Sequence, residues 1–197
     1  LNENYQHPAM PEGVEDGIIK GIYRLKSAET SARQTVKLLG AGAILNEVIA
    51  GAELLANDFG VSADVYSVTS FTELAREADE TARWNMLHPE EPSRRPYVTS
   101  VLATGCDGPV VAATDYMKLV SEQIRAHVSD RYHVLGTDGF GRSDFRRKLR
   151  SHFEVDRHFV AVAALKALAE ENKIPSKTVS EAIVKYGIDH KPDPARA

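Results

Sequence analysis

Residues 35–60 read TVKLLGAGAILNEVIAGAELLANDFG, a short apolar run followed by two glycines and a longer amphipathic stretch. The apolar run at residues 35–39 has the length and composition of a buried strand. In the longer stretch, apolar side chains recur every three or four residues, which places them on one face of a helix: Leu45, Val48, Ala52, Leu55 and Phe59. Gly60 then provides the left-handed conformation that commonly ends a helix. A buried strand that leads into such a helix indicates an α/β sheet.

The same alternation continues along the chain. Further buried strands are predicted at residues 63–68, 110–114 and 133–136, and a weaker edge strand at residues 21–25. Helices are predicted at residues 73–84, 96–102, 117–128, 143–152, 157–171 and 176–186. Strands that alternate with helices form a mainly parallel sheet covered on both faces. The expected fold is therefore α/β, with a doubly wound, mainly parallel sheet of about five strands.

The domain organisation follows from length and from the first residues. The chain has 197 residues, which is enough for one domain with a sizeable core. Residues 1–20 contain two prolines and two glycines, and we expect them to form a lead-in linker from a preceding domain. Residues 21–197 are expected to form the α/β domain. Because the first residue is Leu1 and not methionine, we expect the chain to be processed or excised from a longer protein.

Composition excludes several classes of function. A hydrophobic fraction of 43% and a charged fraction of 26% are typical of a soluble globular protein. A net charge of −4 argues against nucleic-acid binding, which depends on a basic surface. No apolar run reaches the roughly 18–20 residues of a membrane span, and the start does not resemble a signal peptide. Cys106 is the single cysteine, so the chain forms no internal disulfide, and a cytoplasmic location is expected.

The junction between the first buried strand and its helix allows a second interpretation, a freestanding nucleotide-binding domain. Gly40 and Gly42 would let a pyrophosphate approach the helix N-terminus. However, Leu45 stands where the dinucleotide fingerprint has its third glycine. Asp64, about 20 residues further on, lies at the start of the second buried strand and not at its end. A tight turn in a parallel sheet is therefore the favoured interpretation of this junction.

The densest cluster of unusual residues is GTDGFGRSD at residues 136–144. Three glycines in nine residues indicate a backbone that needs positive φ or close contact. The cluster follows a predicted strand and precedes a predicted helix, at the edge where open α/β sheets usually bind ligands. It is either a ligand or subunit-contact loop or a rigid connector whose Ser143 caps the following helix. The candidate interface residues are Asp138, Gly139, Phe140, Gly141, Arg142 and Ser143.

Five cations lie in and after this cluster, at Arg142, Arg146, Arg147, Lys148 and Arg150. They form either a solvated helix face or a surface for an acidic partner. Phe145, Leu149 and Phe153 are expected to form the buried face of the same helix.

Residue types and spacings for catalysis are missing. The seven histidines have no metal-ligand spacing, no Gly-x-Ser-x-Gly elbow is present, and no pair of carboxylates stands out. No residue is therefore assigned a catalytic, cofactor-binding or metal-binding role.

Several blocks of the sequence carry a family resemblance. They read NENYQHPAMP at residues 2–11, DVYSVTSFTEL at 64–74, RWNMLHP at 83–89, TDYMKL at 114–119 and LGTDGFGRSD at 135–144. Together they span nearly the whole chain in the right order. They resemble the C-terminal, transketolase-like domain of the homodimeric decarboxylating subunits of pyruvate dehydrogenase, the acetyl-transferring component. Transketolases are the wider relatives.

The resemblance implies a parent enzyme with three α/β domains. The first two domains bind thiamine diphosphate and magnesium, decarboxylate pyruvate and pass the two-carbon unit to a lipoyl group on the acyltransferase core. The third domain packs beside them and helps to join the two subunits of a homodimer. The family's cofactor-binding motif, activating glutamate and catalytic histidines have no counterpart in this chain, so we expect no activity from it alone. A docking module for the acyltransferase is the alternative role.

Overall fold

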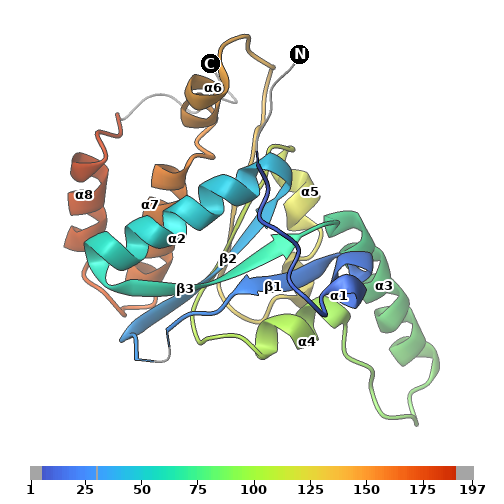
Figure 1. Cartoon of the computed structure of the whole chain (residues 1–197). Coiled ribbons are helices and arrows are strands. Elements are labelled where there is room, and N and C mark those ends of the chain that lie inside the picture. The colour runs from blue at the N-terminus through green and yellow to red at the C-terminus, as the bar shows by residue number, and fades with distance from the viewer. Residues whose placement is uncertain (1–5, 30, 190–197) are drawn as a thin grey trace.

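The computed structural model describes residues 6–29 and 31–189. Its centre is a five-stranded sheet with the order β1-β3-β2-β4-β5 (Figure 1). The strands are β1 (Ile22–Lys26), β2 (Gln34–Ala41), β3 (Val61–Val68), β4 (Val110–Ala113) and β5 (Tyr132–Leu135). The edge strand β1 runs antiparallel to β3, and all other neighbours pair in parallel. The predicted α/β fold with a mainly parallel sheet of about five strands is confirmed.

Helices cover both faces of this sheet (Figure 1). One face carries α2 (Leu45–Phe59), α7 (Arg157–Glu170) and α8 (Ser176–Lys185). The other face carries α3 (Phe71–Leu87), α4 (Tyr97–Ala103) and the region of α5 (Lys118–Glu122). The remaining helices are α1 (Glu15–Lys20), α6 (Arg146–His152) and the short 3-10 helices η1 (Gly42–Ile44) and η2 (Arg125–His127). No helix in the described part of the chain is long and apolar enough to cross a membrane.

Side chains of each central strand alternate between two hydrophobic cores. On β2, Val36 and Leu38 point into the core under α2 and α7, while Leu39 points into the core under α3 and α4. On β3, Val65 points into the core under α2 and α7, and Tyr66 points into the core under α3 and α4. Because both faces of these strands are buried, the strands read as nearly continuous apolar runs in the sequence.

The helix predicted at residues 117–128 is interrupted. The structure has α5 and then η2, with Ile124 fully buried between them. The Thr99 hydroxyl donates to the carbonyl of His127 (2.7 Å), and Arg125 donates to the carbonyl of Tyr132 (2.8 Å). These tertiary contacts, together with burial of Ile124, replace a continuous helix.

The helix predicted at residues 143–152 begins later than expected. α6 starts at Arg146, and Ser143 does not cap it. The Asp144 carboxylate instead accepts a hydrogen bond from the Phe145 backbone N–H at 2.8 Å, a local bond that competes with helix formation. Phe145 is also exposed, so the prediction that it lies on a buried helix face is wrong.

The lead-in at residues 1–20 ends in α1, which packs against the sheet. Gly17 of this helix is buried, and the Thr69 hydroxyl donates to the Ile18 carbonyl at 2.7 Å. Residues 1–5 lie outside the described part of the chain. The division into a linker at residues 1–20 and a domain at residues 21–197 stays a prediction.

Candidate functional site

The candidate interface loop at residues 138–143 lies at the carboxyl edge of the parallel strands. β4 and β5 are parallel neighbours, so the segments that follow Ala113 and Leu135 leave the sheet side by side. The Thr137 backbone N–H donates to the carbonyl of Tyr116 at 2.9 Å, and the Thr137 hydroxyl donates to the carbonyl of Asp115 at 2.6 Å. The loop is therefore tied at its base to the segment after β4.

Asp138 anchors the first half of the loop. One oxygen of its carboxylate accepts a hydrogen bond from the Lys118 backbone N–H at 2.9 Å, and the other lies 3.8 Å from Lys118 Nζ. Asp138 thereby satisfies an unpaired N–H in the first turn of α5 and places a negative charge at the positive end of that short helix. Gly139 follows with φ +89°, a conformation that L side chains rarely adopt.

The second half of the loop points away from the body of the protein. The Phe140 side chain is 85% exposed, and Gly141, Arg142 and Ser143 are also exposed. A Cβ atom added to Gly141 would meet nothing within 4 Å. The structure thus holds Asp138 and Gly139 against α5 and presents residues 140–143 on the surface.

Large apolar side chains are exposed in both segments that leave this edge. Tyr116 and Met117 follow β4, Phe140 and Phe145 follow β5, and each of these four side chains is more than half exposed. Burial of one such side chain stabilises a contact by about 1.5–3 kcal/mol. Exposed apolar side chains that form one contiguous patch mark a contact with another polypeptide, so these four side chains are candidates for such a contact. We call Tyr116, Met117, Phe140 and Phe145 the edge group.

A charged cluster holds the helix that follows the loop. Glu47 on α2 accepts hydrogen bonds from Arg150 on α6 (2.8 Å) and from Arg157 at the start of α7 (2.9 Å). Arg150 also lies 3.3 Å from the carbonyl of Ala43. Burial raises the pKa of Glu47, but the hydrogen bonds and charges of Arg157 and Arg150 outweigh it, so the net pKa lies below its ordinary value. The cluster fixes α6 to α2 and α7, although no residue of α6 is buried.

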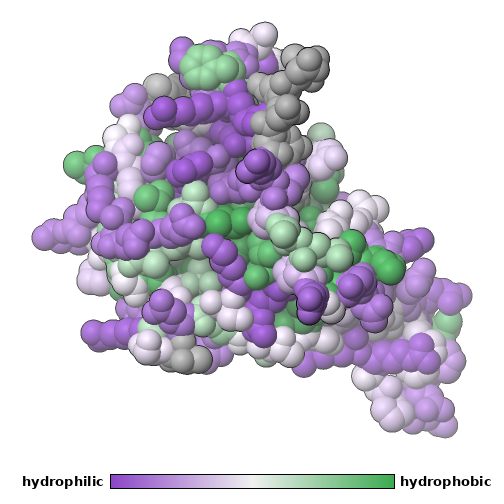
Figure 2. Space-filling view, in the orientation of Figure 1, coloured by the Kyte–Doolittle hydropathy of each residue, from purple (hydrophilic) through white to green (hydrophobic). Residues whose placement is uncertain are grey.

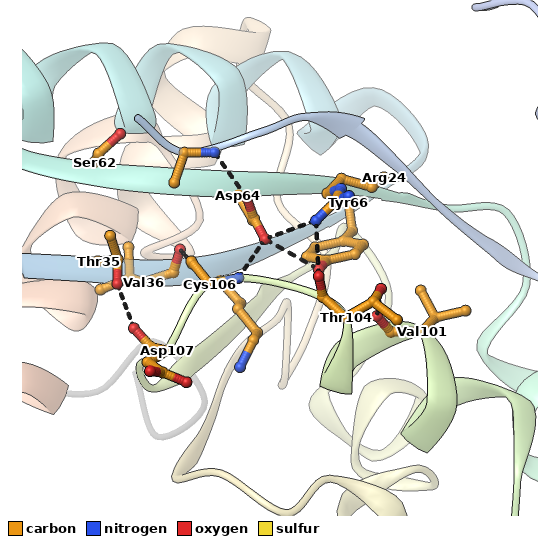
Figure 3. Close-up of polar contacts among 12 residues, drawn as sticks. Arg24, Thr35, Val36, Ser62, Asp64, Tyr66, Val101, Thr104, Cys106 and Asp107 are labelled. Carbon is orange, nitrogen blue, oxygen red and sulfur yellow. Dashed lines mark hydrogen bonds and ion pairs between the residues drawn. The ribbon is translucent and has the colours of Figure 1, made fainter. Parts of the chain in front are cut away.

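A second polar cluster is centred on Asp64 of β3 and includes residues of β1 and of the loop before β4 (Figure 3). One oxygen of the buried Asp64 carboxylate accepts from the Ala28 N–H at 2.7 Å. The other accepts from the Cys106 N–H (2.8 Å) and the Tyr66 hydroxyl (3.2 Å) and lies 3.5 Å from Arg24 Nη1. Asp64 thus joins β1, β3 and the loop before β4, and both of its oxygens accept hydrogen bonds from within the protein.

Electrostatics make this cluster a structural one. Burial raises the pKa of Asp64, but the two backbone hydrogen bonds and the charge of Arg24 lower it by more. The net pKa therefore lies below its ordinary value, and the carboxylate stays ionised at neutral pH. Burial also raises the pKa of the Cys106 thiol, which donates to the Val36 carbonyl at 3.3 Å. A thiol with a raised pKa is a poor nucleophile.

The glycine junction at the end of β2 is a tight packing site. Leu45 is buried, and a Cβ atom on Gly40 would come within 2.8 Å of the Leu45 Cα atom. Because Gly40 has no side chain, the start of α2 can pack directly on β2. This close packing agrees with the interpretation of the junction as a tight turn.

The model of one protein family matches residues 21–156, more than two thirds of the chain, and it describes the transketolase-like TK C-terminal domain. The chain belongs to this family. The resemblance seen in the sequence blocks is confirmed. This transketolase-like C-terminal domain includes both the edge group and the Asp64 cluster within the matched residues.

Curated relatives of the domain are pyruvate dehydrogenase E1 components. Those of Escherichia coli strain K12 and of Pseudomonas aeruginosa are each 58% identical over 190 residues, which cover 96% of this chain and 21% of the relative. That of Cupriavidus necator is 54% identical over 196 residues, which cover 98% of this chain and 22% of the relative. The chain therefore spans about a fifth of the length of these relatives.

Solved transketolases have the same fold. A transketolase of Pichia stipitis crystallised with xylulose-5-phosphate aligns with a TM-score of 0.56 and 18% identity, over 80% of this chain and 19% of the other. The transketolase of Leishmania mexicana aligns with a TM-score of 0.52 and 16% identity, over 79% of this chain and 19% of the other.

Sequence reasoning located the loop but missed its partners. Asp138 was included for its place in a glycine-rich cluster, whereas its contact with Lys118 comes from the folded sheet. Tyr116 and Met117 belong to the block at residues 114–119 that carries the family resemblance, but nothing in the sequence indicates that their side chains are exposed. In the sequence Asp64 is notable only as the acidic residue that a dinucleotide fingerprint would need, because its partners Arg24 and Cys106 are about 40 residues away.

Proposed function

We propose that this chain is the structural and assembly domain of a thiamine diphosphate-dependent pyruvate dehydrogenase E1-type oxidoreductase. The observation that carries the proposal is 58% identity to pyruvate dehydrogenase E1 components over 96% of this chain. In the proposed parent enzyme, pyruvate is decarboxylated and its two-carbon unit acetylates a lipoyl group of an acyltransferase core. A cytoplasmic location is part of the proposal, and a chain with a single cysteine favours it.

The chemistry of the cofactor is assigned to other domains. Thiamine diphosphate is held through a magnesium ion, which prefers oxygen ligands in octahedral geometry. Among residues 6–29 and 31–189, no group of three or more His, Cys, Asp or Glu side chains could hold a metal ion. The proposal therefore assigns thiamine diphosphate and magnesium to other domains of the parent enzyme.

The edge group and the loop at residues 138–143 are proposed to contact the preceding domains or the second subunit of a homodimer. Phe140 is the central residue of this contact because it is the most exposed apolar side chain of the group. Its phenyl ring would gain about 1.5–3 kcal/mol on burial in an apolar interface. The tie between Asp138 and Lys118 would hold the loop in its contact shape before association, which reduces the entropy lost on binding.

A chimera tests this role. The matching 190-residue region of the Escherichia coli relative is replaced by this chain, and pyruvate decarboxylation and subunit assembly are measured. The chimera should be active and assembled. Its Phe140→Asp variant should lose assembly and activity at least about tenfold, because a charge would be buried in the contact.

The matched control is Val184→Asp, which places the same charge at a side chain that is 80% exposed on α8. It should leave assembly and activity unchanged. An assembled and fully active Phe140→Asp chimera would overturn the interface role. Decarboxylation of pyruvate by the 197-residue chain alone would overturn the assembly role.

The second candidate function is a docking module for the acyltransferase component. The observation in its favour is the cationic surface of α6, whose region is mainly hydrophilic in Figure 2 and includes the exposed side chains of Arg147 and Lys148. Co-sedimentation of the chain with the acyltransferase, weakened by salt and by Arg147→Glu, would favour it. Unchanged sedimentation of both components would exclude it.

The nucleotide-binding alternative has a direct test as well. Titration of the chain with NAD, ATP or thiamine diphosphate, followed by calorimetry, should give no heat of binding. Tight binding of any of the three would contradict the assembly role and revive that alternative.

A further inference from the structure

Helix α3 extends well beyond the core that holds its first half. At 1.5 Å per residue, its 17 residues span about 25 Å. Phe71, Leu74 and Ala78 are buried against the sheet, but no residue from 79 to 95 is buried. In Figure 1 the end of α3 and the loop after it project from the body at the lower right. We call residues 79–95 the arm.

Contacts within the arm give it a defined shape without a hydrophobic core. The Trp84 ring stacks on His88, with 4.3 Å between centroids and 9° between planes, and the Arg94 guanidinium lies 3.6 Å from the Trp84 ring centroid. The Asn85 side chain donates to the Arg94 carbonyl (2.9 Å) and accepts from the Arg94 N–H (2.8 Å). The loop is thus closed back onto the end of α3.

The base of the arm is fixed in the same way. One oxygen of the Glu77 carboxylate accepts from the Tyr97 N–H at 2.8 Å, where the chain returns to the body, and the other accepts from the Thr81 hydroxyl at 3.1 Å. The arm is therefore held by hydrogen bonds and ring stacking at its base and tip, with no buried residue of its own.

The surface of the arm combines an apolar pair with charges of both signs. Met86 is 70% exposed and Leu87 is 52% exposed. The acidic pair Glu90 and Glu91 follows, and after Pro92 and Ser93 comes the basic pair of Arg94 and Arg95. In Figure 2 the projection is mainly hydrophilic, with a small green area.

We propose that the arm pairs with the same arm of a second copy of this chain, across a two-fold axis. In such an isologous contact the same patch of both copies is buried, and if one residue contacts a second residue of the partner, that second residue contacts the first, so the patch must complement itself. The arm meets this condition, since the apolar pair meets itself while Glu90 and Glu91 face the partner's basic pair. A partner whose surface carries one sign of charge would repel either the acidic pair or the basic pair.

The inference rests on the assembly role proposed above, because it names one surface through which subunits are joined. The arm is small compared with the roughly 1,200–2,000 Å² that stable interfaces bury. Pairing of the arms alone should therefore be weak and in rapid exchange. The 197-residue chain should show a mass average that rises with concentration from about 10 μM to about 1 mM in sedimentation velocity, as weak transient contacts do.

The first test changes the apolar pair. Met86→Glu should weaken self-association at least about tenfold, because two like charges would meet at the axis. Ile19→Glu is the matched control, because Ile19 is an apolar side chain on α1 that is 76% exposed. It should leave self-association unchanged. Circular dichroism of both variants checks that the fold is intact.

The second test exchanges charges and is specific for a two-fold contact. The variant Glu90→Arg/Glu91→Arg and the variant Arg95→Glu should each associate about tenfold more weakly, because the ion pairs that each substitution breaks occur twice across the axis. An equimolar mixture should recover association, since the new charges complement each other across the axis.

Three outcomes would overturn the arm pairing. They are a monomer at every concentration, self-association that Met86→Glu leaves unchanged, and a mixture that associates no better than its components. These results do not involve Phe140, so failure of the arm pairing is distinguishable from failure of the assembly role. Normal self-association of Phe140→Asp with loss in Met86→Glu would assign the contact to the arm.

Discussion

Glu47 binds Arg157 through both oxygens of its carboxylate, with 2.9 Å between Oε2 and Nε and 3.2 Å between Oε1 and Nη2. Oε2 also accepts from the Arg157 backbone N–H at 3.1 Å. This bidentate pair joins α2 to the start of α7, and Arg150 adds α6 to the same carboxylate. The helix after the candidate interface loop is therefore positioned by charge and hydrogen bonding more than by apolar burial.

Glu47→Gln should destabilise the protein by about 1–3 kcal/mol. Removal of one partner from a buried ion pair costs about 3–5 kcal/mol, and the value here is smaller because the Arg157 side chain is 45% exposed. Urea unfolding followed by circular dichroism measures the change.

Lys177→Gln is the control for Glu47→Gln, since Lys177 and its partner Glu181 are largely exposed on α8. Its effect should stay below about 0.5 kcal/mol, as expected for a surface pair. Equal effects of the two substitutions would show that the Glu47 cluster does not stabilise the fold.

The stability of the protein should fall as the pH drops below about 4. Burial raises the pKa of both Glu47 and Asp64, but hydrogen bonds and arginine charges lower it more, so both folded-state pKa values lie below the ordinary ones. A carboxyl group with a lowered pKa in the folded state stabilises it above its unfolded pKa, near 4. That contribution is lost as the pH falls through the folded-state value.

Urea unfolding at a series of pH values checks this dependence. The free energy of unfolding of Glu47→Gln should fall less steeply in acid than that of the unchanged protein, because one linked group is absent. If the free energies of unfolding of Glu47→Gln and of the unchanged protein fall with pH at the same slope, the role given to Glu47 is contradicted.

The sheet and its order of elements were predictable because local patterns carried them. β2 and β3 are buried on both faces, so most of their residues are apolar, as in Val36, Leu38 and Leu39 of β2, and this pattern is visible in the sequence alone. α2 has one apolar face and ends at Gly60, whose φ is +64°. The breaks at Ile124 and Asp144 depend on partners distant in sequence or on a competing local hydrogen bond, and apolar periodicity does not report either.

The candidate site was predictable only in part for the same reason. A glycine-rich segment after a strand identified the loop, because glycines mark special backbone conformations. The tie from Asp138 to Lys118 spans 20 residues, and that from Asp64 to Cys106 spans 42. The arm escaped prediction because the stacking of Arg94 on Trp84 follows from a loop conformation that no periodicity reports.

Cys106 should react slowly with a disulfide reagent in the folded protein. Burial raises the pKa of its thiol, and the thiolate is the reactive form. The rate with 5,5′-dithiobis(2-nitrobenzoic acid) at pH 8 should rise at least about tenfold when urea unfolds the chain. Equal rates with and without urea would mean that Cys106 is accessible and ionised in the folded state.

Gly139 and Gly141 offer a matched comparison within the candidate interface loop. Gly139 has φ +89°, whereas Gly141 is not among the glycines with positive φ and has open space at its Cβ position. Gly139→Ala should therefore destabilise the loop by about 1–2 kcal/mol, the usual strain of an L residue forced to positive φ. Gly141→Ala should be nearly neutral.

Amide hydrogen exchange at Lys118, whose N–H donates to the Asp138 carboxylate at 2.9 Å, measures the loop directly. Faster exchange in Gly139→Ala and unchanged exchange in Gly141→Ala are expected. If both variants exchange like the unchanged protein, the backbone at Gly139 does not hold Asp138 in place, and the loop would lack the preorganised shape that the proposed contact requires.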